Sequence, residues 1–314
     1  MPTWRNRLAL VKAESTYGTS SAPSTTDALL FTELEVEQLA LELAERETIQ
    51  AFMGHRASLV TQRSVAVNPT VEFAASGTAG TAPRWGALMK ACGCSETIVP
   101  ASPGPGSVTY APVSSGFSSY TLDFFADNGS TQIVAGIRGN AEITMEAGSI
   151  PTLAFSQMGL FAAPTALALP TPTYSAQGAP VVVNSANTTS VSVHGVSACL
   201  SSFSFSLGVE MVFRQLAGCT QQVIITDRKP TGSITIELPA FATQNFLNLC
   251  STQATGAISW VHSGGAGNII TFTASTCAFD APSISEMDQV TMITLPFRAL
   301  PSGSGNNEFS LALT

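Results

Sequence analysis

Charged side chains are scarce in this sequence. Asp, Glu, Lys and Arg make up 11% of the 314 residues and hydrophobic residues reach 45%, whereas about 25% charged residues is usual in a soluble domain. A free monomer of this composition has few charges to spread over its surface. We therefore expect copies of the chain to cover much of one another's surface, as in obligate assemblies whose interfaces resemble a domain core.

Long apolar runs are missing as well. No run approaches the roughly 18 to 20 apolar residues of a membrane-spanning helix, and the best candidate, residues 160–169, is interrupted by Pro164. The N-terminal residues lead from Arg5 and Arg7 through a short apolar stretch to Lys12, without the apolar region of a secretory signal. We expect no membrane association and a protein that stays in the compartment where it is made.

The sequence also lacks the motifs of catalysis and metal binding. It contains no G-x-S-x-G, P-loop or H-E-x-x-H motif. The three histidines, His55, His194 and His262, are far apart in the chain, and Cys92 and Cys94 have no second Cys or His pair at zinc-finger spacing. We expect no catalytic, cofactor-binding or metal-binding residues, and six cysteines that are buried free thiols.

Positive charge is in the minority. The chain has 13 Lys and Arg against 21 Asp and Glu, which gives a net charge of −8. A field of this sign repels phosphate backbones. Specific binding of nucleic acid is therefore not expected.

The sequence is rich in alternation with a period of two. In residues 203–207, Phe-Ser-Phe-Ser-Leu, apolar and polar side chains fall on opposite faces of a strand. Turn-forming Gly, Asn, Ser and Pro lie between such segments. The other strand candidates are residues 34–43, 59–67, 71–73, 107–110, 120–125, 132–137, 141–145, 150–155, 181–184, 191–194, 222–226, 234–238, 258–262, 269–273 and 290–297. The pattern predicts a mainly β fold.

Two segments read clearly as helices. Residues 83–92 begin with a proline and are followed by a glycine, which suits the first and last turns of a helix. Residues 240–249 form the second. The structural anchors predicted for these helices are Trp85, Leu88, Phe246 and Leu247. For Trp85, a contact between subunits is the alternative role.

The two halves of the sequence repeat one order of elements. Residues 48–54 align with 212–218 at an offset of 164, and residues 71–73 with 236–238 at an offset of 165. The helices follow at 159 and the closing strands at 140, so the offset shrinks where loops shorten. The pattern predicts an internal duplication; chance alignment of apolar residues is the alternative.

The duplication divides the chain into four parts. They are an N-terminal arm (residues 1–30), a first β domain (31–165), a linker rich in Ala, Pro and Thr (166–180), and a second β domain (181–314).

Two segments resemble a known family. Residues 82–96, Ala-Pro-Arg-Trp-Gly-Ala-Leu-Met-Lys-Ala-Cys-Gly-Cys-Ser-Glu, and residues 10–19, Leu-Val-Lys-Ala-Glu-Ser-Thr-Tyr-Gly-Thr, resemble the tail tube (major tail) proteins of long-tailed bacteriophages of the siphophage type. The similarity covers about residues 8–160. The second half carries only the hydrophobic skeleton and lacks the Trp-Gly element.

The resemblance implies a β-sandwich or barrel with one short flanking α-helix, whose sheet joins those of neighbouring subunits in a ring. Rings would stack into a tube that carries the genome. Combined with the duplication, it implies two tandem tail-tube-like domains per chain and pseudo-hexameric homotrimer rings. The N-terminal arm, rich in Ser and Thr and poor in core residues, is then expected to be partly disordered alone and to order against an adjacent ring.

The resemblance also implies a structural virion protein of the tail, assembled in the host cytoplasm, with no enzymatic activity and no cofactor. Its partners would be other copies of itself, the tail tape-measure and terminator proteins, and DNA that passes without specific binding. A capsid decoration protein or an adhesin-like β-sandwich binding module is the alternative. A secreted hydrolase has less support, because no catalytic constellation is visible in the sequence.

Acidic residues cluster near the start of the first predicted domain. On a strand, Glu33, Glu35 and Glu37 share one face, and Glu42 follows them. We expect them in the channel wall, because a surface of the same sign as DNA keeps the duplex from adhering. A solvated outer strand is the alternative. Glu210 is the matching candidate in the second half.

Overall fold

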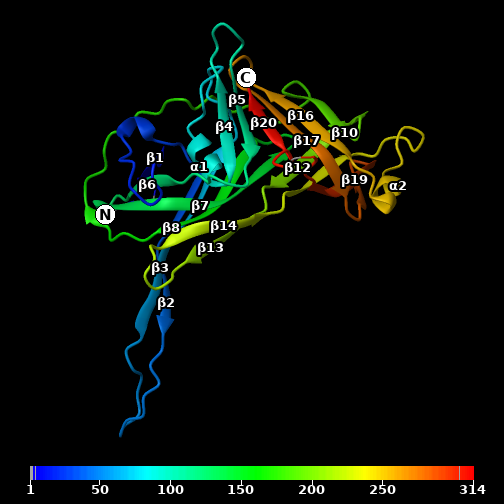
Figure 1. Cartoon of the computed structure of the whole chain (residues 1–314). Helices are drawn as coiled ribbons and strands as arrows, with labels where there is room; N and C mark the ends of the chain where they lie inside the picture. The colour runs from blue at the N-terminus through cyan, green and yellow to red at the C-terminus, as the bar shows by residue number, and fades with distance from the viewer. Residues whose placement is uncertain (1–2, 4, 304) are drawn as a thin grey trace.

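The structure is a computed structural model that describes residues 3, 5–303 and 305–314. In these residues antiparallel strands dominate, accompanied by two short α-helices and one 3-10 turn, η1 (Thr25–Asp27). One hairpin projects far from the body, downward in Figure 1. The predicted mainly β fold with two short helices is confirmed.

The largest unit is a sheet with the spatial order β2-β3-β8-β7-β12-β15-β19-β18, in which all neighbours are antiparallel. We call it the eight-stranded sheet. Its strands are β2 (Glu33–Ala44), β3 (Leu59–Glu72), β8 (Thr152–Leu160), β7 (Ser130–Glu146), β12 (Leu200–Ser206), β15 (Thr231–Glu237), β19 (Val290–Ala299) and β18 (Ser283–Met287). The pair β7–β12 joins four strands from the first half of the chain to four from the second.

A second layer covers the apolar face of the eight-stranded sheet. Its main sheet has the order β4-β5-β20-β17-β16-β10-β11. These strands are β4 (Cys94–Val99), β5 (Ser107–Pro112), β20 (Ser310–Leu313), β17 (Ile269–Phe279), β16 (Gly256–Ser263), β10 (Thr188–Val193) and β11 (Val196–Ser197). Because β20 lies between β5 and β17, the C-terminal strand ties the two halves of the chain together.

Smaller elements complete the layer. β1 (Leu8–Ala13) and β6 (Tyr120–Phe125) pair with each other, and β6 and β9 (Thr165–Ala166) pair with the N-terminal part of β7. A bulge at Gly136, whose φ of +66° favours glycine, lets β7 bend from this sheet into the eight-stranded one. The helices are α1 (Gly86–Ala91) and α2 (Phe246–Thr252), and β13 (Val209–Arg214) and β14 (Gln222–Arg228) form a separate hairpin.

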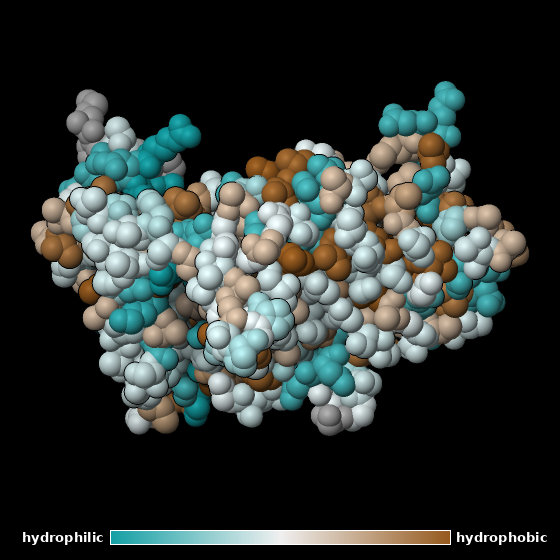
Figure 2. Space-filling view, turned by 90° about the horizontal axis from the view of Figure 1, so that it is seen from above, coloured by the Kyte–Doolittle hydropathy of each residue, from teal (hydrophilic) through white to brown (hydrophobic). Residues whose placement is uncertain are grey.

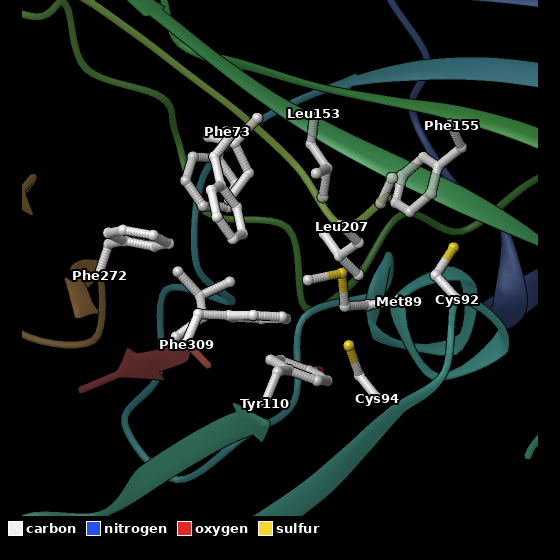
Figure 3. Packing of buried hydrophobic residues seen from close by; sticks show 14 of the residues in the cluster. Phe73, Met89, Cys92, Cys94, Tyr110, Leu153, Phe155, Leu207, Phe272 and Phe309 are labelled. Atoms are coloured by element: carbon white, nitrogen blue, oxygen red, sulfur yellow. The ribbon is translucent and has the colours of Figure 1, made fainter. Parts of the chain in front are cut away.

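The core is shared by both halves. Phe203 of the eight-stranded sheet lies 5.1 Å, between ring centroids, from Phe272 of the second layer. Figure 3 shows Phe73 and Tyr110 from the first half pointing into the same region as Phe272 and Phe309 from the second. The two halves therefore pack as neighbours across one continuous core, and the division into two domains stays a prediction.

Most strand positions follow from the alternation. Residues 120–125 coincide with β6, and in β12 Phe203 and Phe205 are buried between half-buried serines. Two predicted strands, 132–137 and 141–145, are one strand, β7. Residues 181–184, all of them described, form no strand. The sequence prediction missed β1, β4, β11, β13, β18, β20 and the short β9.

The second helix lies later than predicted. α2 begins at Phe246, after Asn245, whose side chain accepts a hydrogen bond from the Asn248 N–H. Phe246 is 2% exposed, whereas Leu247 is 55% exposed, which corrects the expectation that Leu247 anchors the helix. In the first helix, Leu88 is completely buried.

The N-terminal arm contributes to the core, contrary to the expectation. β1 pairs with β6 along its whole length, and its first four residues, Leu8 to Val11, are buried. The predicted linker runs along the first half of the chain: Gly178 donates its N–H to Ala75 O, and Arg84 donates its N–H to Ala176 O. Removing residues 1–30 would therefore take a strand out of the fold.

The cysteines only partly fit the expectation. All six are free in the described chain. Cys92, Cys94 and Cys277 are buried, but Cys199 and Cys219 are exposed. None of the helices in the described residues has the length and apolar character needed to cross a membrane.

Candidate assembly surface and channel face

The two groups of four strands in the eight-stranded sheet repeat one pairing register. Thr70 of β3 lies opposite Ala154 of β8, and Thr235 of β15 lies opposite Thr294 of β19. The offsets, 165 and 140, are those found in the sequence, and they relate all five residue pairs that the two registers have in common. Matched hydrogen-bonding register supports the predicted duplication more strongly than matched hydrophobicity, since a slip of one residue would reverse both faces.

One face of the eight-stranded sheet is polar. Its side chains alternate with those buried against the second layer. The carboxylates on this face are Glu33, Glu35, Glu37, Glu72, Glu142, Glu146 and Glu237. Its hydroxyls include Thr70, Thr144, Ser202, Ser204, Ser206, Ser233, Thr235 and Thr294. We call this surface the polar face.

A bulge in the β2–β3 hairpin keeps the predicted acidic residues on one side. Between Glu37 and Ala40, β2 advances three residues while β3 advances two. Residues that pair across strands point to the same side, so the extra residue returns Glu42 to the side of Glu37. Strict alternation would have placed Glu42 on the opposite side. The structure thus brings together Glu33, Glu35, Glu37 and Glu42.

The structure places Glu210 elsewhere. It lies on β13, outside the eight-stranded sheet, and its carboxylate is 2.9 Å from the Lys229 ammonium. Lys229 also contacts Asp227 at 2.9 Å, and hydrogen bonds to these two carboxylates raise the pKa of Lys229. The negative charge of Glu210 is thus compensated locally by Lys229.

Both outer strands of the eight-stranded sheet have an open edge. Among the described residues, β2 pairs with β3 alone and β18 with β19 alone. All five residues of β18 are exposed, and Ile284 remains 56% exposed although it is apolar. Open edges present unpaired N–H and C=O groups and act as templates for another strand.

A cavity of about 650 Å³ lies beside the open edge of β2. Its wall includes Arg5, Arg7, Phe31, Thr32 and Tyr174. The wall also includes Glu33 and Glu35, so the cavity combines side chains of both charges with apolar ones.

The β2–β3 hairpin projects from the body (Figure 1) and exposes apolar side chains near its tip. Residues 45–58 at its tip have no regular strand or helix, and His55 lies among them, exposed. Ile49 and Met53 are fully exposed, and Phe52 is 71% exposed. Several large apolar residues this close together mark a surface that another molecule covers. We call residues 38–64 the hairpin arm.

Elsewhere the surface carries few charges. Figure 2 shows a face mostly of intermediate hydropathy, with hydrophobic patches over its centre and strongly hydrophilic groups confined to a few places. This agrees with the low charged fraction of the sequence.

The segment around Trp85 has a packing role. The indole N–H donates to Ala74 O at 2.8 Å, and the Trp85 ring lies 5.3 Å from that of Tyr110. A Cβ on Gly86 would lie 2.2 Å from the Tyr110 hydroxyl, which itself donates to Glu96. Burial and the neighbouring Glu96 raise the pKa of Tyr110. Trp85, Gly86 and Glu96 of the motif thus meet around one buried tyrosine.

The upstream motif holds the N-terminal loop in place. The Glu14 carboxylate accepts hydrogen bonds from Gly18 N, Ser119 Oγ, Thr121 Oγ1 and Gly136 N. The Tyr17 hydroxyl accepts from Val223 N, and the Arg138 guanidinium lies 4.4 Å from the Tyr17 ring centroid. These contacts connect the loop to β7 and to β14.

The other two histidines are packed. His194 stacks on Phe279 at 4.3 Å, and His262 Nδ1 lies 2.9 Å from Thr188 Oγ1. Burial lowers the pKa of both. In the part of the chain that the structure describes, no three His, Cys, Asp or Glu side chains are grouped to hold a metal.

Sequence reasoning missed the β18 edge for a specific reason. β18 and β19 are joined by Asp288 and Gln289, which have φ values of 53° and 66°. Hairpin turns with two positive φ angles favour Asn-Gly or Asp-Gly, and Asp-Gln lacks that signature. The only signals available were Ile284 and Met287 in an otherwise polar segment.

Comparison with known proteins agrees with this architecture. A family model described as phage tail tube protein matches residues 3–299. No curated protein matches the chain. The match covers nearly the whole chain, including both repeats of the eight-stranded sheet. The chain therefore belongs to the phage tail tube protein family, whose members are structural components that assemble into the tube of the virion tail.

Proposed function

We propose that three copies of the chain form a ring, and that stacked rings form a tail tube through which DNA passes along an acidic channel. The observation that carries this proposal is the eight-stranded sheet, with two four-strand repeats in one register between two open edges. Three copies supply twenty-four strands, which correspond to six repeats.

Strand direction favours closure. Neighbours alternate in direction across the eight-stranded sheet, so β18 of one copy meets β2 of the next antiparallel, as β7 meets β12 within a copy. Such a contact joins two different surfaces of the chain, and contacts of this kind form rings when the rotation closes.

The dimensions suit a duplex. At a strand spacing of about 4.8 Å, twenty-four upright strands have a circumference of about 115 Å and a backbone diameter of about 37 Å. A strand tilt of about 40° widens the diameter to about 48 Å. Inward side chains then leave room for double-stranded DNA.

The polar face is the proposed channel wall, because the second layer already covers the apolar face. Glu33, Glu35 and Glu37 would lie there with the carboxylates of the central strands. Arg298 lies on the same face, but it forms an ion pair with Asp280 at 3.0 Å. The resulting excess of negative charge repels phosphate groups and lets DNA slide.

The hairpin arm is the proposed contact between rings. It projects beyond the body and exposes Ile49, Phe52 and Met53, whose burial on a neighbouring ring would stabilise the stack at about 25 cal/mol per Å² of apolar surface. We further propose assembly in the host cytoplasm, contacts with the tape-measure and terminator proteins at the tube ends, and no covalent chemistry.

Mass and microscopy test the ring. Purified protein measured by mass photometry is expected at three times 32.5 kDa, and negative-stain class averages are expected to show threefold annuli with six similar lobes. A chain that stays monomeric at every concentration, or annuli of six whole chains, would overturn the proposal.

Charge reversal tests the channel. Glu142→Lys with Glu237→Lys places four added charge units on the polar face of each copy, away from both open edges. Tubes of this variant are expected to retain short DNA in a salt-sensitive manner, and wild-type tubes are not. Glu210→Lys with Asp227→Lys makes the same charge change outside the sheet and is the matched control. Equal retention by both variants would contradict the assignment of the channel wall.

A further inference from the structure

We infer that β18 of one copy pairs with β2 of the next copy in the register that β7 and β12 use inside the chain, with the β18–β19 turn seated in the cavity beside β2. The inference rests on the proposed ring and specifies its junction residue by residue.

The pairing of β7 with β12 inside the chain, which we call the internal junction, provides the template for the contact between copies. Thr144 of β7 lies opposite Thr152, and Ser285 of β18 lies opposite Met292, at the offset of 140 that relates β8 to β19. β18 therefore occupies in the second repeat the place that β7 occupies in the first.

β2 and β12 correspond in the same way. Glu35 of β2 lies opposite Asn68, and Ser204 of β12 lies opposite Ser233, at the offset of 165 that relates β3 to β15. Inside the chain, Ser204 pairs with Thr144. Between copies, Glu35 therefore pairs with Ser285. The remaining pairs, β2 residue first, are Glu33 with Met287, Leu34 with Glu286, Val36 with Ile284, and Glu37 with Ser283.

This register explains the exposed apolar residue on β18. Ile284 corresponds to Ile143, which is completely buried and lies opposite Phe205 at the internal junction. In the free chain Ile284 is 56% exposed. The proposed pairing places it opposite Val36, where the next copy covers it.

The turn after β18 fits the cavity. At the internal junction, Ala147 donates its N–H to Ser201 O at 2.8 Å. Residues of β7 and β18 correspond at an offset of 141, and those of β2 and β12 at an offset of 169, so Asp288 corresponds to Ala147 and Thr32 to Ser201. Thr32 is part of the wall of the 650 Å³ cavity beside β2. The turn of the neighbouring copy thus enters that cavity.

The matched register identifies a second copy of this chain as the occupant, and Arg5 adds a charge contact. The end of the incoming β18 and its turn carry Glu286 and Asp288, both exposed, and the cavity wall includes the exposed Arg5 together with Arg7, Glu33 and Glu35. Complementary charges at the rim of an interface select the partner and its register.

The acidic residues of β2 disfavour a twofold dimer in which two β2 strands pair. An antiparallel contact between two β2 strands would set the acidic residues Glu33, Glu35 and Glu37 of one copy against those of the other. Like charges directly opposite on neighbouring strands are destabilising. β2 is therefore suited to pair with β18 rather than with itself.

Engineered disulfides test the register. Glu35→Cys with Ser285→Cys, in a Cys199→Ser and Cys219→Ser background, is expected to give a covalent trimer on a non-reducing gel that reverts to single chains on reduction. Glu35→Cys with Ser283→Cys is the out-of-register control. These diagonal neighbours would be about 7 to 8 Å apart, with Cβ atoms only somewhat closer, and a disulfide requires Cβ atoms roughly 3.5 to 4.5 Å apart. Thr144→Cys with Ser204→Cys, the equivalent internal pair, should close within a single chain.

The outcomes separate the register from the ring. Annuli that form without the Glu35–Ser285 cross-link, or that cross-link better through the out-of-register pair, overturn this inference and leave the ring standing. Folded protein that forms no annuli overturns both.

A charge exchange gives a second, independent measurement. Glu286→Arg is expected to raise the concentration needed for ring formation, and adding Arg5→Glu to it should lower that concentration again. Both residues are exposed, and the double variant controls for the loss of the hydrogen bond that Glu286 accepts from Gln289 N in its own turn. Equal behaviour of the single and double variants would contradict the proposed contact.

Discussion

The substitution Ile284→Thr measures how much the proposed junction gains from apolar burial. Threonine keeps the β-branched shape that suits a strand and removes most of the apolar surface. Complete burial of an isoleucine side chain is worth about 1.5 to 3 kcal/mol. Ile284 is 56% exposed in the free chain and its counterpart Ile143 is 0% exposed, so the substitution should cost about 0.8 to 1.7 kcal/mol at each junction.

Three junctions multiply this effect. A ring would lose about 2.5 to 5 kcal/mol, which lowers the association constant of three chains by about 70- to 5,000-fold. Because that constant depends on the third power of the chain concentration, the concentration at half assembly should rise by its square root, about 8- to 70-fold.

Mass photometry over a dilution series measures this shift. The melting temperature of the dissociated chain should stay nearly constant, since Ile284 makes little contact within its own copy. Ile98→Thr on β4, where the side chain is 48% exposed, is the matched control and should leave the ring-forming concentration unchanged. An unshifted midpoint for a folded Ile284→Thr chain would refute the reasoning, and so would an equal shift for Ile98→Thr.

Three further predictions concern the single chain. Leu88→Ala, at a completely buried site, should lower the free energy of unfolding by about 2 to 5 kcal/mol, and Leu247→Ala, at a 55% exposed site, by much less, as urea denaturation would show; equal losses would contradict the burial assignment. Burial raises the pKa of Asp123 to about 6, so the native state holds this proton more tightly than the unfolded chain and stability should fall as pH rises from about 4 to about 6. Asp123→Asn should therefore be more stable than wild type at pH 7.5, and the difference in stability should disappear below pH 4. A difference that does not change with pH would contradict the raised pKa of Asp123. Glu308→Ala removes the partner 2.7 Å from the buried Arg228 and should lower the free energy of unfolding by about 3 to 5 kcal/mol. Arg228→Met with Glu308→Leu should lower it by less than the single change. Calorimetry at fixed pH checks which variant is the less stable.

Local alternation accounts for what the sequence determined. In segments such as residues 203–207, apolar and polar residues alternate. This alternation determines both the strand conformation and the buried face, because successive side chains of a strand point to opposite faces. The shared hydrophobic skeleton of the two halves likewise predicted offsets of 165 and 140, which the pairing registers reproduce. The Trp85 and Glu14 motifs carry the resemblance to the family, and in the structure their side chains form hydrogen bonds to the backbone of other segments.

Tertiary structure decided the features that local pattern does not encode. α2 begins at Phe246 because Asn245 caps it and Phe246 reaches Phe279, a contact from a distant strand. Glu42 joins the acidic side through a bulge, which depends on the partner strand as much as on β2. β18 also depends on a partner strand. Its five residues alternate only weakly, and they form a strand because they pair with β19. Side-chain pattern is a property of one segment, but sheet order, edges and cavities arise from long-range pairing. The surface proposed to join copies of the chain could therefore be inferred only from the folded molecule.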